Sequence, residues 1–308
     1  MLLMAAASVT ISKLLDYDPV PYIFSATIMI NLGGTSTLIG SPSNMIIGVA
    51  SGISFTDFIT YLTLCEVLLW VATISLLYYY FKPKLGRKKD LPEYNPWKSV
   101  ENKRFFYQSI LILALLVLLF FALDYLGIGP EAVAVGCAIL ALVLSNCDPS
   151  EIFKGIDWET VFFVAGFMFI IGGIQRTEML DSLSTQLFQL FGGSATGATL
   201  ATLWFSGVAS AIVSNMAIAL TFVPVALNFS SVNPNLRLPV TSALVLGTNL
   251  GGATTPLSGS VPMMAMGTLK REGISMNLSE FTKIGILTSA VQLLFASLYL
   301  ILRFSLGG

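Results

Sequence analysis

The 308-residue chain contains no histidine, only three cysteines and only 11% charged residues. Without histidine, no imidazole is available as a metal ligand or as a catalytic acid–base group. Cys65, Cys137 and Cys147 lack metal-ligand spacing, and no paired carboxylates provide an acid–base couple. A net charge of −1, without a basic and aromatic-rich stretch, argues against nucleic acid. We therefore expect no enzyme, no metal site, no cofactor and no nucleic-acid partner.

Apolar residues dominate the chain instead: 55% are hydrophobic, and the mean hydropathy is +0.81. A soluble domain carries about 25% charged residues, well above the proportion here. Nearly uncharged segments of roughly 18 or more residues can cross a bilayer core, and they cover 58–81, 106–123, 128–145 and 284–302. The sequence predicts an all-α polytopic protein in the lipid bilayer.

One heptapeptide occurs twice, 218 positions apart, and each copy interrupts a long apolar stretch. The copies read Asn-Leu-Gly-Gly-Thr-Ser-Thr over 31–37 and Asn-Leu-Gly-Gly-Ala-Thr-Thr over 249–255. Such a run frees backbone groups that lipid cannot satisfy, so it needs protein or a water-filled cavity around it. Matching breaks predict two broken transmembrane helices around a site near the midplane. Close helix packing by small residues is the competing explanation.

The repeat extends beyond the heptapeptides. Pro21 aligns with Pro239, and 52–58 parallels 273–281 after a two-residue insertion. We expect inverted repeats, with 1–104 as the later part of the first repeat and 105–308 as the second. Each is expected to contain a re-entrant helical hairpin, or part of one, then a broken helix and a final spanning helix.

Lysine and arginine predict the orientation in the membrane. Segment 82–104 contains eight of the sixteen basic residues, which places it in the cytoplasm. Arg176, Arg237 and Arg303 fall on the outer side when crossings are counted from this segment. The two broken helices then run in opposite directions. The remaining basic residues fall on the cytoplasmic side: Lys13, Lys154, Lys270, Arg271 and Lys283.

Three segments do not fit simple spanning helices. Residues 1–15 are apolar but too short to cross, which predicts a re-entrant piece. Residues 196–229 are split by the polar stretch 209–215 and predict a hairpin that enters and leaves on one face. Segment 176–194 mixes Leu and Phe with polar residues, which predicts an interfacial helix.

The breaks supply the groups that a binding site needs. Two pairs of glycines allow conformations closed to other residues and the close approach of a ligand: Gly33, Gly34, Gly251 and Gly252. Helix N-termini at a break favour an anion, whereas helix C-termini and carbonyl groups can bind Na⁺. Amide and hydroxyl side chains complete the predicted site without a buried charge: Asn31, Thr35, Thr37, Ser41, Asn44, Ser214, Asn215, Asn249, Thr254, Thr255 and Ser258.

The chain resembles an ion transporter superfamily at these residues. Stretch 31–44 resembles its pattern N-[IL]-G-G-T-A-T-L-I-G-D-P-P-N, and 158–166 resembles its W-x-T-L-[LF]-F-F-A-G segment. Stretches 246–252 and 280–285 match as well. The superfamily contains arsenite permeases, NhaD-type antiporters, the pigmentation P protein, citrate transporters and divalent-anion/sodium symporters. The resemblance implies a plasma-membrane transporter, commonly a homodimer, that carries a small oxyanion, carboxylate or metalloid with Na⁺ or H⁺ as coupling ion.

The chain departs from the superfamily pattern in several places. Ser41 stands where an Asp is usual, and Met216 replaces the Thr of a Ser-Asn-Thr motif. Subtracting 218 from Ser214 and Asn215 gives positions before Met1, so we expect a shortened first hairpin. An arsenite efflux permease and an inactive remnant or assembly partner are therefore the alternatives to an anion transporter.

Glu66 is the acid that lies deepest in a predicted span. Intramembrane carboxylates are costly and commonly functional, so Glu66 is a candidate for proton coupling. The alternative is a residue near the interface that forms a hydrogen bond with a neighbour.

Overall fold

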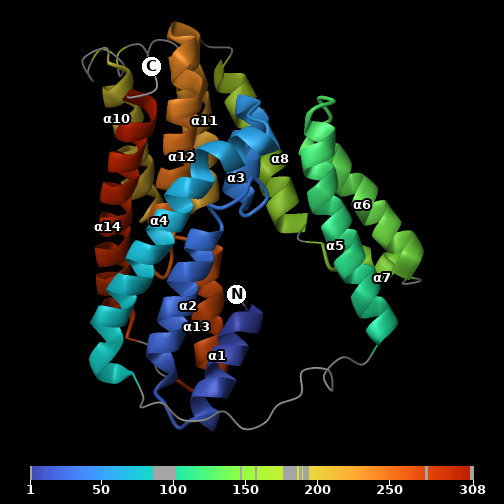
Figure 1. Cartoon of the computed structure of the whole chain (residues 1–308), viewed down its shortest axis with the longest axis vertical. Helices are drawn as coiled ribbons and strands as arrows, with labels where there is room; N and C mark the ends of the chain where they lie inside the picture. Colours follow the sequence, from blue (N-terminus) through green and yellow to red (C-terminus); the bar gives the residue numbers. More distant parts are fainter. Residues whose placement is uncertain are drawn as a thin grey trace. The chain divides into compact units, whose positions relative to one another are not determined.

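The computed structural model describes residues 2–85, 102–145, 148–156, 158–175, 186, 189, 194–274 and 277–305. These residues form helices, turns and bends, and no strand occurs among them (Figure 1). The chain divides into two compact units. Unit 1 comprises 1–53, 58–88 and 168–308, and unit 2 comprises 54–57 and 89–167. The all-α prediction is confirmed.

Unit 1 contains both heptapeptides and most of the helices. Its N-terminal helices are α1 (Leu2–Leu14), α2 (Pro19–Gly33), α3 (Pro42–Ser51) and α4 (Phe55–Phe81), whose first turn belongs to unit 2, followed by the short η1 (Lys82–Lys84). Its C-terminal helices are α10 (Ala195–Ser210), α11 (Asn215–Val232), η3 (Pro234–Leu236), α12 (Arg237–Gly251), α13 (Ser260–Arg271) and α14 (Leu278–Ser305).

Unit 2 is built from α5 (Lys103–Asp124), α6 (Pro130–Ser145), α7 (Pro149–Lys154) and most of α8 (Trp158–Gln175). The first turn of α4 is fixed to α5 by stacking between Phe55 and Phe120, whose ring centroids are 4.9 Å apart. Asp124 also accepts a 3.0 Å hydrogen bond from the Thr56 backbone N–H. This polar contact satisfies a donor at the helix start, where intrahelical partners are lacking.

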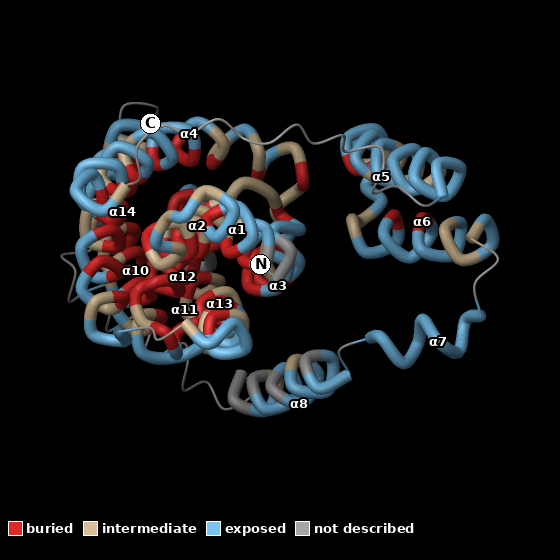
Figure 2. The backbone as a smooth tube through the Cα atoms, turned by 90° about the horizontal axis from the view of Figure 1, so that it is seen from below, coloured by how far each residue is buried: buried red, intermediate tan, exposed pale blue. Residues whose placement is uncertain are grey.

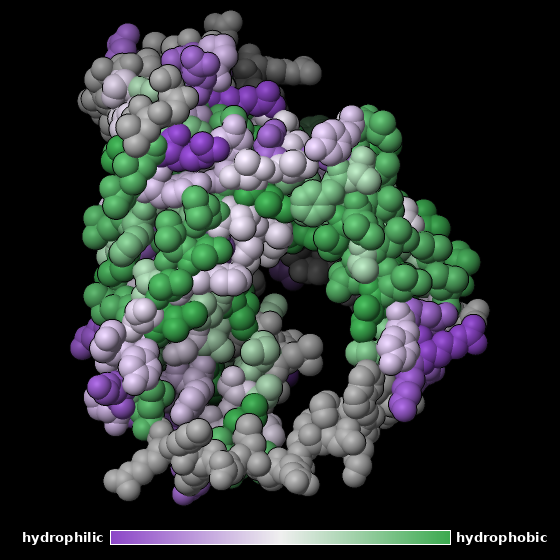
Figure 3. Space-filling model, in the orientation of Figure 1, coloured by the Kyte–Doolittle hydropathy of each residue, from purple (hydrophilic) through white to green (hydrophobic). Residues whose placement is uncertain are grey.

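Three helices of the described chain are long and apolar enough to cross a membrane: Phe55–Lys84, Lys103–Asp124 and Leu278–Phe304. The predicted span 128–145 is the shorter α6, of 16 residues. Large apolar side chains are exposed on the long helices, including Val71 on α4 and Leu294 on α14. Figure 3 shows large green, hydrophobic areas on the face in view. Such a surface is stable against lipid and costly in water.

Helix α12 forms the centre of unit 1. Every residue from Pro239 to Gly251 is buried, and Figure 2 shows α12 in red within unit 1. It packs against α10, α11, α3, α2 and α14. The contact with α10 is very close, because a Cβ on Gly251 would lie only 2.1 Å from the Gly207 carbonyl oxygen. Small residues let the two backbones approach in this way.

The two broken helices run in opposite directions within unit 1. Lys13, at the end of α1 and before α2, pairs with Glu272 just after α13, at 2.6 Å. Arg237, at the start of α12, donates to the Gly52 carbonyl just after α3, at 2.9 Å. The beginning of one broken helix therefore lies beside the end of the other, and the predicted inversion is confirmed.

The predicted hairpin at 196–229 is also present. Helices α10 and α11 are separated by residues 211–214 and pack against each other. Ala195 at the start of α10 and Asn233 after α11 line the same cavity, so both arms reach the same end of unit 1. Within the predicted re-entrant piece 1–15, the described residues contain the single short helix α1, Leu2–Leu14. The predicted interfacial helix at 176–194 and most of the basic segment 82–104 lie outside the described residues.

Candidate functional site

The first break, residues 34–41, lies between α2 and α3. The Asn44 side-chain amide donates to the Gly34 carbonyl at 2.8 Å and to the Thr37 carbonyl at 2.9 Å. Ser41 caps α3 by accepting a 3.3 Å hydrogen bond from the Asn44 backbone N–H. Asn44 is fully buried, so its two donors satisfy carbonyl groups that the interrupted helix leaves open.

The second break, residues 252–259, separates α12 from α13. Here the buried Ser258 hydroxyl lies 3.0 Å from the Gly252 carbonyl and 2.8 Å from the Thr255 carbonyl. These carbonyls are the equivalents of those of Gly34 and Thr37, 218 positions earlier. Different side chains thus face the same backbone positions in the two breaks: Asn44 has a donor for each carbonyl, whereas the single Ser258 hydroxyl proton is within reach of both.

Three buried asparagines join the two repeats directly. The Asn31 amide donates to the Asn249 backbone carbonyl at 2.6 Å. The Asn249 amide in turn donates to the Asn44 Oδ1 at 2.6 Å and to the Val245 carbonyl at 2.8 Å. Buried amides of this kind stabilise a structure only when their partners are in place. The repeated asparagine is therefore the point at which the two broken helices meet.

The hairpin tip packs against the second break. The Ser210 hydroxyl donates to the Thr248 carbonyl at 2.6 Å, and the Thr255 hydroxyl donates to the Ala211 carbonyl at 2.9 Å. Ser214 itself is exposed, whereas Asn215 approaches the second break, since a Cβ on Gly252 would lie 3.5 Å from its Cβ. The structure thus brings the predicted tip and the second break together, with Ser210 and Ala211 making the hydrogen bonds.

The glycines of the two breaks do not use the conformations that are closed to other residues. Gly34 and Gly252 have right-handed backbone angles, with φ of −60° and −68°. Neither Gly33 nor Gly251 is among the positive-φ glycines of the described chain. The need for glycine is instead steric, and it is strongest at Gly251 because of the adjacent Gly207. Close approach of protein backbone explains this position without a special conformation.

Helices α4 and α14 flank the breaks. On α4, Glu66 is 2% exposed, and its Oε1 accepts hydrogen bonds from the Trp70 indole at 2.6 Å and from the Ser36 hydroxyl at 3.4 Å. The Glu66 Oε2 has no hydrogen-bond partner among the described residues. On α14, the Ser289 hydroxyl accepts from Thr254 and donates to the Leu250 carbonyl, both at 2.8 Å. Each of these two helices therefore contacts one break.

The predicted site residues are uncharged apart from Glu66. Thr35 donates to the Leu32 carbonyl within the first break, and Thr254 bonds Ser289. No group of three or more His, Cys, Asp or Glu side chains suited to a metal ion occurs in the part of the chain that the structure describes. The site offers amides, hydroxyls and backbone groups, which bind polar oxygens and hydroxyl-rich ligands.

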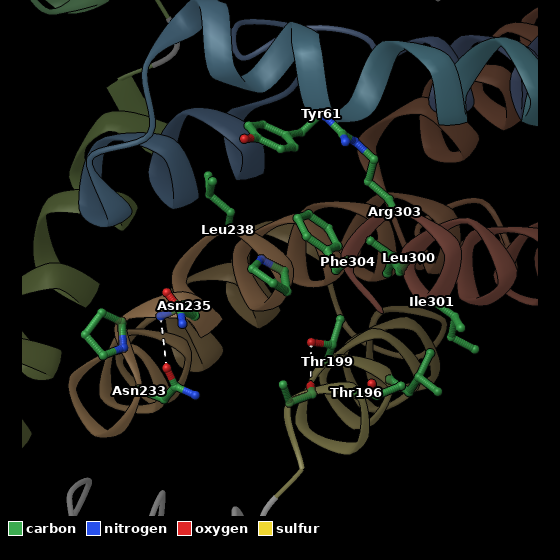
Figure 4. A pocket seen from close by; sticks show the side chains of 14 residues that line it. Tyr61, Thr196, Thr199, Asn233, Asn235, Leu238, Leu300, Ile301, Arg303 and Phe304 are labelled. Carbon is green, nitrogen blue, oxygen red and sulfur yellow. Dashed lines mark hydrogen bonds between the residues drawn. The ribbon is translucent and has the colours of Figure 1, made fainter. Parts of the chain in front are cut away.

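A separate cavity of about 580 Å³ opens at the end of unit 1 where α10 and α12 begin (Figure 4). Among the described residues that line it, Arg303 supplies the only charged side chain, and the Arg303 guanidinium lies 5.0 Å from the centre of the Tyr61 ring. Asn233 and Asn235 lie opposite on the loop before α12. The cavity contains none of the predicted site residues, so it is distinct from the breaks.

Sequence reasoning missed several residues of the network. Ser210 and Ser289 lie outside both heptapeptides, and Trp70 lies one helical turn after Glu66. The spacing of four between Glu66 and Trp70 is a signal that could have predicted their contact. No comparable local signal leads to Ser289, because its partners are 35 and 39 positions away.

Comparison with known proteins gives the family context. The family model described as citrate transporter matches residues 1–235 and, in an overlapping second match, residues 128–307. An uncharacterised transporter of Mycobacterium tuberculosis is 27% identical over 309 residues, which cover 98% of this chain and 72% of the relative. An uncharacterised transporter of Synechocystis is 26% identical, over 97% of this chain and 71% of the relative. The arsenical pump membrane protein of Escherichia coli is 22% identical, over 92% and 67%.

Proposed function

Because the chain belongs to the citrate transporter family, we propose that this membrane transporter is a secondary active transporter that works by alternating access. Its proposed substrate is a small oxyanion, carboxylate or metalloid species. The proposed site comprises the two breaks and the hairpin tip at 211–215.

The link between Asn31, Asn249 and Asn44 carries this proposal. It joins two inverted broken helices at their breaks through hydrogen bonds of 2.6 Å. In transporters built from inverted repeats, substrate and ion sites form where discontinuous helices meet near the midplane. A pair of breaks held by side-chain amides can also exist in two arrangements, because a few hydrogen bonds distinguish them.

The chemistry of the site favours a small hydroxyl- or carboxyl-bearing substrate. Helix α13 begins at Ser260 after Gly259, which provides no side-chain cap. Of the first helical residues, Ser260 and Val261 can offer a backbone N–H to a carboxylate or another oxygen ligand, whereas Pro262 has none. We propose that the hydroxyls of Thr255 in the second break and Thr37 in the first supply further polar ligands without a cationic side chain.

Efflux of arsenite or antimonite is the second candidate. It is favoured by the similarity to the E. coli arsenical pump membrane protein. An uncharged trihydroxy metalloid needs hydroxyl and amide partners rather than cationic ones, and the breaks provide those groups. Transport of this kind would show little dependence on Na⁺.

The orientation and assembly form part of the same proposal. Lys13 and Lys84 lie at one end of unit 1, where each forms an ion pair with the later half of the chain, and Arg303 lies at the other end. This separation supports a cytoplasmic segment 82–104 in a plasma-membrane protein, by the positive-inside rule. We propose a homodimer, with Na⁺ or H⁺ as the coupling ion.

Uptake into proteoliposomes tests the proposal. The purified protein is reconstituted, and radiolabelled citrate, a simple dicarboxylate and arsenite are compared with and without a Na⁺ gradient and with and without a pH gradient. Saturable, gradient-driven uptake of a carboxylate supports the first candidate, whereas arsenite movement that is independent of Na⁺ supports the second. Absence of transport of all three substrates, in vesicles that contain folded protein, would contradict both.

A further inference from the structure

In an alignment of the two repeats, Glu66 and Ser289 occupy equivalent positions. Phe58 on α4 corresponds to Phe281 on α14, and the same offset relates Glu66 to Ser289. Ser36 in the first break corresponds to Thr254 in the second, 218 positions later. The contacts correspond as well, because Ser36 bonds Glu66 and Thr254 bonds Ser289. Each final helix therefore contacts its own break at the same place.

The two equivalent positions differ in how completely they are satisfied. The Ser289 hydroxyl accepts one hydrogen bond and donates another, so its capacity is largely used. Glu66 uses Oε1 as an acceptor and leaves the buried Oε2 without a partner in the described structure. The Oε2 atom of such a carboxyl group can therefore still form one more bond, for example to a proton.

Among the described residues, no positively charged side chain forms an ion pair with Glu66. Cys65, which adjoins Glu66 on α4, is the titratable neighbour, and its thiol is buried as well. From the first break, the groups that face the carboxyl are the hydroxyls of Ser36 and Thr35. A buried carboxylate without a counter-charge is unfavourable, so neutralisation by a bound cation is expected.

The hydrogen bonds around Glu66 favour a proton over Na⁺. The Trp70 N–H points at Oε1 from 2.6 Å and would repel a metal cation at that oxygen. The Thr35 hydroxyl donates its own proton to the Leu32 carbonyl, so towards Glu66 it offers lone pairs only. A proton on Oε2 needs only one hydrogen-bond acceptor, such as the Thr35 hydroxyl oxygen. A Na⁺ ion needs several oxygen ligands.

We propose that Glu66 Oε2 is the proton-binding site of this transporter and that its protonation acts on the first break alone. The carboxylate takes a proton from hydronium on one side of the membrane, forms one O–H bond and becomes neutral. It returns the proton to water on the other side. Loss of the charge changes the contact with Ser36, while the matching contact at Ser289 does not titrate. This inference rests on the proposed transport function.

The test uses the full-length protein and the Glu66→Gln variant in proteoliposomes, with whichever of citrate, the dicarboxylate or arsenite the wild type carries. Glutamine keeps the acceptor for Trp70 and removes the titrating group. We expect the stimulation of uptake by a pH gradient to be lost, so that uptake falls to the rate measured without a gradient. Exchange of labelled for unlabelled substrate without a gradient should persist and should not vary with pH.

Controls separate this inference from the proposed function. Glu131→Gln removes an exposed carboxyl group at the start of α6 and should leave gradient-driven uptake unchanged. Glu66→Asp retains a carboxyl group and should retain a pH response. Gradient-driven uptake by Glu66→Gln at the wild-type rate would overturn the inference while leaving the transport function intact.

Infrared spectroscopy tests protonation without any transport. A carboxylic acid stretch that titrates in the wild type and disappears in Glu66→Gln is expected. A wild-type spectrum without that band at any pH would overturn the inference, even if neither protein transports a substrate.

Discussion

The first and second breaks each contain two equivalent backbone carbonyls that accept side-chain hydrogen bonds, yet the side chains around the two breaks are different. In the first break, Asn44 satisfies them and also reaches across to Asn249. In the second, the single Ser258 hydroxyl lies within hydrogen-bond distance of both, and Thr255 donates to the hairpin tip. The α4 side of the first break carries Glu66, whereas the α14 side of the second carries Ser289. The two breaks therefore have equivalent backbone positions but differ in the side chains that contact them.

Because of this difference, the two halves of an inverted repeat can have different roles in transport. The end of α12, directly before the second break, packs closely against α10, and Ser258 in the break pairs with near neighbours. The first break depends on a long-range amide contact and adjoins a carboxyl oxygen that lacks a partner in the described structure. We infer that the second break is the more rigid of the two and that the first responds to the coupling ion.

The largest expected effect comes from the pair Gly251→Ala and Gly33→Ala. The new methyl group on residue 251 would lie 2.1 Å from a backbone oxygen, whereas at residue 33 no described atom lies within 4 Å. We expect Gly251→Ala to destabilise the protein by about 3 kcal/mol, at the upper end for overpacking, and Gly33→Ala to be nearly silent. Thermal unfolding in detergent measures both, and equal effects would contradict the difference between the breaks.

A smaller effect is expected from the pair Asn249→Ala and Asn31→Ala. Asn249 donates to two partners and leaves the buried Asn44 Oδ1 unsatisfied when it is removed. Asn31 makes one such bond, to the Asn249 carbonyl. Losses of about 2 and about 1 kcal/mol respectively follow from the usual cost of buried unpaired groups. Denaturant unfolding measures the loss of stability in both variants. A greater loss for Asn31→Ala would contradict the larger contribution expected from Asn249.

Ser258→Ala is expected to cost about 1 kcal/mol, because it leaves two carbonyls of the second break with one partner fewer. The matched control is Ser75→Ala, which removes an exposed hydroxyl hydrogen-bonded to its own helix on α4. The control should be close to neutral. If both variants unfold alike, the Ser258 hydroxyl does not stabilise the break.

The smallest effect is expected from Thr255→Val, which removes one hydrogen bond to the Ala211 carbonyl. The Thr37 hydroxyl forms no such bond with described residues, so Thr37→Val should change stability less. A difference of about 0.5–1 kcal/mol between the two variants is the normal net value of a single hydrogen bond. Hydrogen exchange at the hairpin tip would show the local opening.

Sequence reasoning located the breaks, their inversion and the hairpin, because glycine-rich interruptions and loop charges are local signals. It could not pair Asn44 with Ser258, because these residues occupy different positions in the two repeats and only the carbonyls they bind correspond. The direct contact between Asn31 and Asn249 could not be predicted either, because a spacing of 218 positions in the sequence does not say how close two residues lie in space. For Glu66, the sequence indicated the depth in the span, whereas the open Oε2 follows from side-chain packing.

Thiol labelling tests most directly whether the two breaks form one substrate site. Cysteine is placed at Thr37 or Thr255 in a variant without native cysteines, and membrane-impermeant reagents are applied from either side of proteoliposomes. We predict that both positions react from both sides and that the transported substrate slows both reactions. Reaction from one side only, or labelling that substrate leaves unchanged, would contradict a shared site with alternating access.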